Sequence, residues 1–345
     1  MKKILCTIVL FCIAPVLFAQ TQVVNIYNWS GYIPDEVLTA FEKETGIHVN
    51  YSTFDSNEVL YTKLKVVDPH ADYDIVVPSS STLQHMINED MLQPIDHSQL
   101  SNMKYLNPQL LNQPYDPHNQ YSLPYLWGTT GILINTQYYS PKEIQRWSDL
   151  WKPDLQGKIA VLDEMRDVFG ASFKVLGYSI NDSNPAHIQA AYLKLSDLLP
   201  NIQSFQSDGT QQMYVNEDAN IGIIENGDAN SVIAENPHYQ YIYPKDGVIL
   251  WVDNMAIPRG ASHIKNAYRF MNFVMRPDIA AKISMGVGFS SPNLAAIKLM
   301  PKDEQDNRTL NPEPADLSHA EVEGYLSRET NDVYLYYWEM LKLKL

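Results

Sequence analysis

The chain has 345 residues, of which 45% are hydrophobic. At about 150 residues per domain it is long enough for two domains, each with a sizeable core. The formal net charge is −15 at pH 7. An acidic surface disfavours nucleic acid and anionic lipid as partners and favours cationic ones, although solubility alone explains most of the acids.

Residues 1–19 have the pattern of a signal peptide. Two lysines precede an apolar run over residues 4–18, and Ala19 ends this run. A membrane anchor is the alternative, but the run is short for a span and no second hydrophobic stretch follows it. We expect an exported protein whose mature net charge is −17, because both lysines are lost with the signal peptide.

The mature chain is expected to lack disulfides, bound metal and cofactors. Both cysteines, Cys6 and Cys12, lie in the predicted signal peptide. The nine histidines show no close ligand spacing, and the acids within residues 163–167 match no calcium-binding loop. The sequence also contains no Gly-x-Ser-x-Gly, no phosphate-binding loop and no His-Glu-x-x-His, so it carries none of these common enzyme motifs.

Strands and helices alternate along the chain, which implies α/β units with parallel strands and right-handed crossovers. Strands are expected over residues 23–27, 48–51, 74–77, 132–135, 157–163 and 220–224. Helices are expected over residues 34–46, 55–66, 185–199, 262–281 (two, divided at Arg276-Pro277) and 331–345. Residues 102–121 are predicted to be irregular.

The segment 123–128, bracketed by proline and glycine, is predicted to cross between two α/β units, and segment 251–258 leads away from the second unit. Polar and aromatic residues gather at the ends of the expected strands, where α/β sheets bind ligands. We therefore expect a ligand cleft between the two units, with hinge closure around the ligand.

Trp251 and Asp253 form the strongest candidate pair for a ligand. Residues two apart in a strand share a face, so the indole ring and the carboxylate lie side by side. Such a pair suits an ammonium group. Taken alone, a core tryptophan beside a loop-facing aspartate is the more common arrangement.

Three further groups follow expected strands or helices. Trp29 and Tyr32 could flank a cation or an alkyl chain, or could cap the sheet. Residues 79–82, Ser-Ser-Ser-Thr, could offer hydroxyl groups to a ligand, although capping of a following helix is the commoner use. Phe289 stands near the head of a loop over residues 288–293.

Two pairs of acids complete the candidates. Glu164 and Asp167 share a face if a helix begins there, and they would favour a cation. The alternatives are ordinary N-terminal helix acids, paired with Arg166, and a catalytic carboxylate pair. Glu225 and Asp228 bracket Asn-Gly, for which a turn with two solvated acids is the simplest interpretation.

At the level of whole motifs the sequence resembles the periplasmic spermidine/putrescine-binding proteins of bacterial ABC importers. The resemblance covers nearly the whole mature chain. Its landmarks are YNWSGY (27–32), ETGI (44–47), YDIVVPS (73–79), PYLWG (124–128), WSDLWKP (147–153), RDVF (166–169), WVD (251–253) and PNLAA (292–296).

The resemblance implies a two-lobed, type II-like periplasmic binding protein fold with the ligand held between the lobes. On this basis the first lobe comprises residues 20–123 and 256–301, and the second comprises residues 124–255 and 302–345. The implied ligand-binding residues are Trp29, Ser30, Tyr32, Ser79, Ser81, Glu164, Asp167, Glu225, Asp228, Trp251, Asp253 and Phe289. The family's aromatic walls match Trp29, Tyr32 and Trp251, and the carboxylate that grips an ammonium group matches Asp253.

The chain also differs from the family's pattern. Spermidine binders have an aromatic residue at the position of Ser81, a tryptophan at that of Glu225 and a tyrosine at that of Phe289. They have Asp and then Glu where Glu164 and Asp167 stand, and a glutamine that matches loosely near Thr330. Asp228 resembles the acid of putrescine-preferring members. These differences concern which polyamine is bound, not the cationic class.

The sequence thus predicts a monomeric, non-enzymatic periplasmic protein that captures spermidine or putrescine and delivers it to an ABC permease in the inner membrane. Five carboxylates in one site would repel one another, so one or two are expected to point outward or to pair with Arg166 or water. The alternatives are a secreted hydrolase that uses Glu164 and Asp167, and a polyamine sensor that does not transport.

Overall fold

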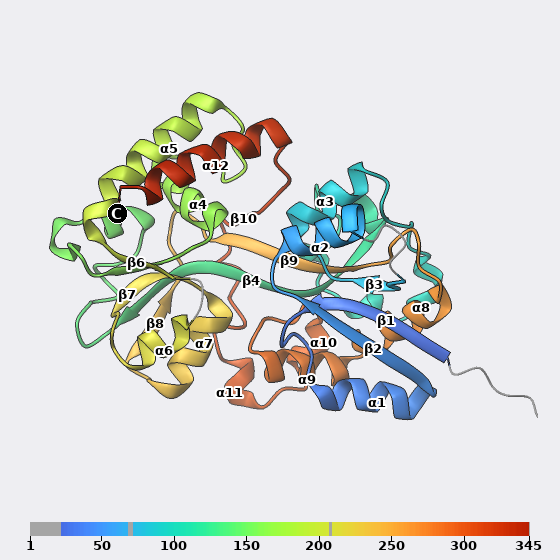
Figure 1. Cartoon of the computed structure of the whole chain (residues 1–345). Helices are drawn as coiled ribbons and strands as arrows, with labels where there is room; N and C mark the ends of the chain where they lie inside the picture. Colours follow the sequence, from blue (N-terminus) through green and yellow to red (C-terminus); the bar gives the residue numbers. More distant parts are fainter. Residues whose placement is uncertain (1–21, 68–71, 207–208, 345) are drawn as a thin grey trace, which may run out of the picture.

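The computed structural model describes residues 22–67, 72–206 and 209–344, and the predicted signal peptide lies outside them. Helices gather in two groups, one around each end of a long central sheet (Figure 1). Among the described helices, none is long and apolar enough to cross a membrane.

The first half of the sheet is parallel, as the alternation of strands and helices predicts. Strand β1 (Gln22–Trp29) pairs in parallel with β2 (Ile47–Phe54) and with β3 (Ile75–Val76). The intervening helices are α1 (Asp35–Thr45), α2 (Asn57–Thr62) and α3 (Ser80–Asn88). Gly46 ends α1 because its left-handed conformation (φ 70°) favours glycine, and β2 begins at the next residue.

Two long antiparallel strands connect the halves of the molecule. Strand β4 (Ser122–Asn135) runs without a break through the segment where the sequence predicts a crossing and a separate strand. It pairs with β9 (Ile249–Ala256), from Ser122↔Ala256 to Thr130↔Ile249. Every residue of β4 is buried, so its backbone groups need partners in neighbouring strands. In Figure 1 these two strands cross the middle of the molecule, between the two groups of helices.

The second half adds four strands and four helices among the described residues. The strands are β5 (Ile159–Leu162), β6 (Ile202–Gln206), β7 (Ile221–Glu225) and β8 (Tyr239–Ile242). The helices are α4 (Met165–Leu176), α5 (Pro185–Leu198), α6 (Thr210–Val215) and α7 (Asn226–Glu235). The sequence did not predict β6, β8 or α6, because segments this short carry too little periodicity.

Helix α7 begins where the sequence predicts a turn with solvated acids, so that prediction is wrong. Asn226 is buried, and its Oδ1 accepts the backbone N–H of Thr129 at 3.0 Å while its Nδ2 donates to the carbonyl of Thr309 at 2.8 Å. With Asn226 tied to two other segments, the chain passes from β7 directly into a helix. Glu225 and Asp228 therefore lie at the N-terminal end of α7.

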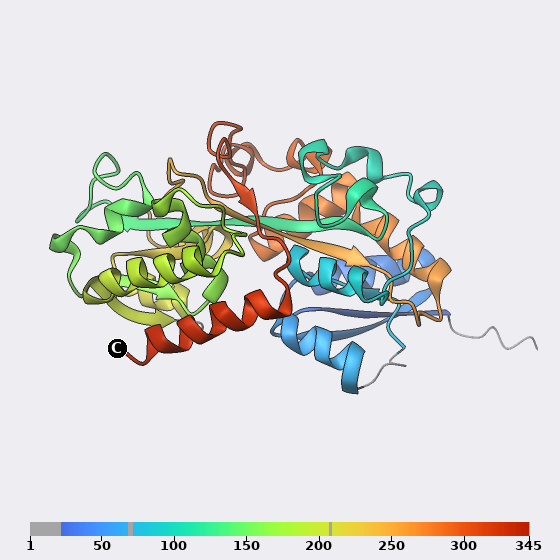
Figure 2. The same ribbon diagram turned by 90° about the horizontal axis from the view of Figure 1, so that it is seen from above.

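The C-terminal elements return to both halves. They are α8 (Ile264–Val274), α9 (Pro277–Val287), α10 (Leu294–Ile297), α11 (Lys302–Gln305), β10 (Glu321–Val322) and α12 (Arg328–Lys342). The break between α8 and α9 and the final amphipathic helix agree with the sequence-based prediction. Helix α12, red in Figure 2, runs along the second half beside α5 and buries Tyr334, Trp338 and Leu341.

The strands form one sheet in the order β2-β1-β3-β9-β4-β7-β5-β6, with β10 beside β9 and β8 beside β4. Its two halves have separate cores, which we call the first core (with Phe41 and Met255) and the second core (with Trp147 and Ile249). The fold is thus α/β with two large centres of packing and a continuous sheet, and in a smaller cluster Tyr27 and Phe54 pack with Val252 of β9. Two of the proposed lobe boundaries fall in β4 and β9 and the third falls just before α11, and all three remain a prediction.

The pattern of β9 shows where the two cores leave a gap. Side chains alternate between the faces of a strand, so Ile249, Trp251, Asp253 and Met255 share one face. Ile249 belongs to the second core and Met255 to the first. Trp251 and Asp253 stand between them and belong to neither, so this stretch of the sheet is available to a ligand.

Packing in the first core predicts that removal of the Phe41 ring will strongly destabilise the protein. Phe41 is fully buried and packs edge-on against Phe270 and Phe273, with ring centroids 5.0 and 5.3 Å away. Phe41→Ala should lower the free energy of unfolding by about 3–5 kcal/mol in denaturant titrations, because it leaves a cavity. Tyr138→Ala, at a ring that is 61% exposed, is the control and should change stability by less than about 0.5 kcal/mol. A similar small loss for both variants would contradict this account of the core.

Candidate ligand-binding site

Strand register places several predicted residues on one face of the sheet. Trp251 on β9 lies opposite Gly128 on β4, and Ile249 lies opposite Thr130. Thr130 in turn lies opposite Glu225 at the end of β7. Directly opposed residues share a face, so Trp251 and Asp253 of β9 point to the same side of the sheet as Glu225 of β7.

Asp253 is fixed by two hydroxyl groups. Tyr32 Oη donates to Asp253 Oδ2 at 2.6 Å, and Ser79 Oγ donates to Oδ1 at 2.6 Å. Burial raises the pKa of Asp253 to about 6, and the two hydrogen bonds oppose this rise because they stabilise the ionised form. The carboxylate is thus oriented and buried, but among the described residues no cation pairs with it.

Ser79 does not cap helix α3 with its side chain, so the capping interpretation is wrong for this residue. Asn57, at the start of α2, holds Ser79 instead: its Nδ2 donates to Ser79 Oγ, and its Oδ1 accepts the backbone N–H of Ser79, both at 3.1 Å. Ser79 is thereby turned toward Asp253. Asn57 is a supporting residue that sequence reasoning missed.

Four aromatic rings form a connected row that includes Tyr32, a hydrogen-bond partner of Asp253. Ring centroids are 6.5 Å apart for Trp29 and Tyr32, 5.6 Å for Tyr32 and Phe289, and 5.4 Å for Phe289 and Trp251. The rings are tilted or edge-on to one another, so flat faces remain for other contacts. Tyr32 is further held at its backbone carbonyl, which accepts a hydrogen bond from Tyr125 Oη at 2.8 Å.

Two glycines let these rings approach the backbone. A Cβ atom on Gly128 would lie 2.2 Å from Trp251 Cζ2, and one on Gly227 would lie 2.1 Å from Phe289 Cε1. Any larger residue would therefore displace a ring. Sequence reasoning missed both roles. The available signal for Gly128 was a glycine inside a run of apolar strand residues, whereas Gly227 follows a strand and was interpreted only as part of an Asn-Gly turn.

Several acidic side chains lie on the same face of the sheet, at the end that belongs to the second half of the molecule. Glu164 and Asp167 flank the start of α4, which confirms that a helix begins there. Burial raises the pKa of Asp167 to about 8, assisted by repulsion from Glu323. Burial also raises the pKa of Glu225 well above its usual range, assisted first by Asp167.

The other two acids are less confined. The pKa of Glu164 is raised to about 7, first by desolvation and then by Glu58 and Glu323. Because the Glu164 side chain is exposed, solvent screening reduces the energetic weight of this shift. Asp228 also has a raised pKa owing to burial, and Gln211 Nε2 donates to its Oδ1 at 2.9 Å.

Glu323 joins this group and was missed by the sequence analysis. Its backbone N–H donates to the carbonyl of Leu250 at 2.8 Å, and its carbonyl accepts from Ser80 Oγ at 2.6 Å. Its carboxylate lies 3.6 Å from Arg166, which also donates to the carbonyl of Gly324 at 3.1 Å. One or two of the five predicted acids were expected to point outward or to pair with Arg166 or water, but the salt bridge of Arg166 among the described residues is with Glu323.

Some predicted residues do not join the cluster. Ser30 is exposed, and Ser81 sits in the first turn of α3 with no hydrogen bond to the cluster among the described residues. Thr330, the loose match for a ligand-binding glutamine, lies in the first turn of α12, where Ser327 Oγ accepts its backbone N–H at 3.2 Å. Glu323 is the residue that the fold brings to the site from this part of the chain.

Buried polar atoms without partners mark the same region. Trp29 Nε1, Trp251 Nε1, Arg166 Nε and Asp167 Oδ1 are all buried and make no hydrogen bond to other described residues. Leaving such atoms unpaired costs about 1–3 kcal/mol each. A ligand bound among these acids and rings could pair with the four atoms, whereas other unpaired atoms, such as Asn119 Nδ2 and Ser204 Oγ, lie elsewhere in the described chain.

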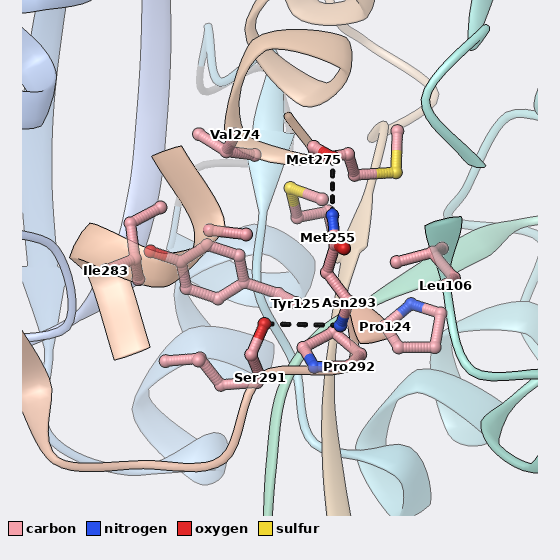
Figure 3. Close-up of a pocket in the computed structure, with 12 residues that line it drawn as sticks. Leu106, Pro124, Tyr125, Met255, Val274, Met275, Ile283, Ser291, Pro292 and Asn293 are labelled. Carbon is pink, nitrogen blue, oxygen red and sulfur yellow. Dashed lines mark hydrogen bonds between the residues drawn. The ribbon is translucent and has the colours of Figure 1, made fainter. Parts of the chain in front are cut away.

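The cavity shown in Figure 3 is a different place. It lies in the first core and has a volume of about 10 Å³, at the lower limit of what can hold one water molecule. Its wall shows how the loop after Phe289 is held: Asn293 Nδ2 donates to the carbonyl of Met275 at 2.8 Å, and Ser291 Oγ accepts the backbone N–H of Asn293 at 3.2 Å. The residues around this cavity thereby help to position the loop that carries Phe289.

Asp72, Asp74 and His263 are close enough together to hold a metal ion. Both oxygens of Asp74 already accept backbone N–H groups, from Asn25 at 2.8 Å and from His263 at 2.6 Å. The carboxylate therefore fastens two segments of the first half to each other. This structural role accounts for its complete burial without a metal.

Asp167 predicts how stability depends on pH. A carboxyl whose pKa is higher in the folded than in the unfolded chain binds more protons when folded, so stability falls as pH rises from about 4 to about 8. In the ligand-free protein, Asp167 should cost on the order of 3 kcal/mol between pH 5.5 and 8.5. Thermal unfolding of Asp167→Asn should show a weaker pH dependence and a higher Tm than the wild type at pH 8.5. An unchanged slope would show that Asp167 is not confined as described.

Gly128 predicts a steric effect on Trp251. Gly128→Ala should move the indole ring, change the near-ultraviolet circular dichroism and destabilise the protein by about 1–3 kcal/mol. Gly260→Ala is the matched control, because nothing lies within 4 Å of its added Cβ. Equal spectra for Gly128→Ala and the wild type would mean that the ring does not rest on this glycine.

Comparison with known proteins identifies the family. The model of the bacterial extracellular solute-binding proteins matches residues 36–310. The spermidine/putrescine-binding periplasmic protein of Escherichia coli (strain K12) is 40% identical over 316 residues, which cover 92% of this chain and 90% of that protein. The putrescine-binding periplasmic protein PotF of the same organism is 34% identical over 323 residues, covering 87% and 86%.

Solved structures give the same result. The spermidine/putrescine ABC transporter substrate-binding protein PotD from Streptococcus pneumoniae has a TM-score of 0.85 and 35% sequence identity, and the match covers 93% of this chain and 99% of that chain. The expected periplasmic binding protein fold is confirmed by this similarity. The chain belongs to the family of bacterial extracellular solute-binding proteins.

Proposed function

We propose that the protein binds a linear polyamine, spermidine or putrescine, in the periplasm and delivers it to an ABC permease in the inner membrane. The observation that carries this proposal is Asp253, a buried carboxylate that Tyr32 and Ser79 orient beside the ring of Trp251 without a cationic partner among the described residues. The names of the similar proteins support the ligand class and the transport role.

The geometry suits both parts of a polyamine. An ammonium group can pair with Asp253, and a buried ion pair is favourable only when such additional hydrogen bonds hold the carboxylate in place. The row of rings from Trp29 to Trp251 offers apolar faces to the methylene chain. The remaining acids offer further partners for ammonium groups along the same face.

Delivery requires a closed, loaded form that the permease recognises. We propose that the lobes of residues 20–123 with 256–301 and of residues 124–255 with 302–345 close on the ligand as rigid bodies. Because β4 and β9 run through both halves, closure would bend these two strands. A monomer is sufficient, since the described chain supplies every residue of the cluster.

The proposal treats the protein as a carrier without enzymatic activity, and the family to which it belongs supports this. A hydrolase that uses Glu164 and Asp167 is the alternative, and it is tested by recovery of the ligand. Native mass spectrometry of the protein incubated with a polyamine should return the ligand unchanged. Hydrolysis products would instead favour the alternative.

Calorimetry tests the proposal directly. Wild-type protein should bind spermidine or putrescine, and Asp253→Asn or Trp251→Ala should weaken binding by roughly 30-fold or more, because each removes a main contact of an ammonium group. Asp303→Asn, at an exposed acid, is the matched control and should bind as the wild type does. Absence of heat or of a thermal shift with every polyamine would refute the function.

A further inference from the structure

Asn28 is a polar side chain in a row of core positions. It lies on β1, where Val24 and Ile26 share its face and belong to the first core. Only 3% of Asn28 is exposed. Burial of an amide is unfavourable unless its groups are hydrogen-bonded, so the partners of Asn28 decide what this residue does.

The Asn28 side chain reaches three partners. Its Oδ1 accepts the backbone N–H of Trp29 at 2.8 Å. The phenol groups of Tyr51 on β2 and Tyr125 on β4 also have the Asn28 side chain as a hydrogen-bonding neighbour, which opposes the rise in their pKa that burial causes. An amide nitrogen has two N–H groups, so Nδ2 can donate to both phenol oxygens.

Both phenol groups act in turn on the segment that carries two rings of the site. Tyr51 Oη donates to the carbonyl of Trp29 at 3.3 Å, and Tyr125 Oη donates to the carbonyl of Tyr32 at 2.8 Å. The two hydroxyl groups therefore hold the backbone at either end of residues 29–32. The Asn28 amide connects these two hydroxyl groups from within the core.

The segment depends on such support because it leaves the sheet. Trp29 is the last residue of β1, and Gly31 turns the chain with a left-handed conformation (φ 67°). Tyr32 lies beyond this turn, outside the strands and helices, yet its Oη donates to Asp253 Oδ2 at 2.6 Å. Strand pairing therefore does not fix Tyr32, whereas hydrogen bonds from side chains on the strands do.

We infer that Asn28 is a positioning residue of the ligand site, which sets the Trp29 and Tyr32 rings through the hydroxyl groups of Tyr51 and Tyr125. This inference rests on the proposed function and adds a residue that does not need to touch the ligand. A buried network whose members are all hydrogen-bonded restricts the chain to one arrangement. An apolar residue at position 28 would release both phenol groups, and the two rings would no longer be held in place.

Calorimetry with spermidine and putrescine on the full mature protein tests the inference. Asn28→Leu keeps a similar volume but removes the amide, and it should weaken amine binding by roughly 10-fold because two rings of the site lose their support. Tyr125→Phe removes one hydroxyl group and should weaken binding by roughly fivefold. Asn201→Leu is the matched control. Asn201 is also buried and donates to the carbonyls of Leu150 and Lys152 in the second half, so this variant should lose stability but keep the wild-type affinity.

A double-mutant cycle separates positioning from general destabilisation. If Asn28 acts through the two phenol groups, Asn28→Leu should weaken binding by less than about twofold in a protein that already carries Tyr51→Phe and Tyr125→Phe. The ligand-free protein gives a second readout. The near-ultraviolet circular dichroism of Trp29, measured as the difference between proteins with and without Trp29→Phe, should change in Asn28→Leu and stay unchanged in Asn201→Leu.

The outcomes separate this inference from the function on which it rests. Wild-type affinity in Asn28→Leu, an equal loss of affinity in Asn201→Leu, or fully additive losses in the cycle would each overturn the inference and leave the polyamine function intact. Failure of the wild-type protein to bind any polyamine would overturn the function, while the signal of Trp29 would still test the positioning role. If Asn28→Leu does not fold, the Phe variants of Tyr51 and Tyr125 test the same hydroxyl groups, and wild-type affinity in both would overturn the inference.

Discussion

The antiparallel pairing of β4 with β9 is the constraint on which the rest of the structure depends. These strands pass through both halves, so their register decides which side chains fall into either core and which fall between them. Because side chains alternate between the two faces of a strand, Trp251 and Asp253 share a face with Ile249 and Met255, which belong to different cores. A shift of the strand register by one residue would turn the Asp253 side chain to the opposite face of the sheet and would abolish the site.

The site opposes the stability of the fold. Acids gathered in a region with little water raise one another's pKa, and indole N–H groups and a carboxylate oxygen remain without partners. Such an arrangement is unfavourable without a ligand. Under the proposed function, a cation with several donors would replace protons and water, and the difference between the empty and filled states would contribute to binding.

Supporting residues hold this arrangement in place. Asn57 turns Ser79 away from the usual capping role and toward Asp253. Tyr125 holds Tyr32 in place by donating a hydrogen bond to the backbone carbonyl of Tyr32. Gly128 and Gly227 permit Trp251 and Phe289 to rest on the backbone where a Cβ would collide with them. None of these residues needs to touch the ligand, yet each sets the position of a group that is expected to do so.

The sequence by itself determined the α/β class, most of the longer helices and strands, and the pairing of a ring with a carboxylate at Trp251 and Asp253, because these depend on local periodicity and on motifs. It did not determine that β4 is one strand, that a helix begins at Asn226, or that Glu323 reaches the site. These features depend on partners distant along the chain: Asn226 is fixed by Thr129 and Thr309, and Glu323 by Leu250 and Ser80. Tertiary structure alone could decide them, because a buried polar group adopts whatever conformation satisfies its hydrogen bonds, and the sequence does not reveal which segment will supply them.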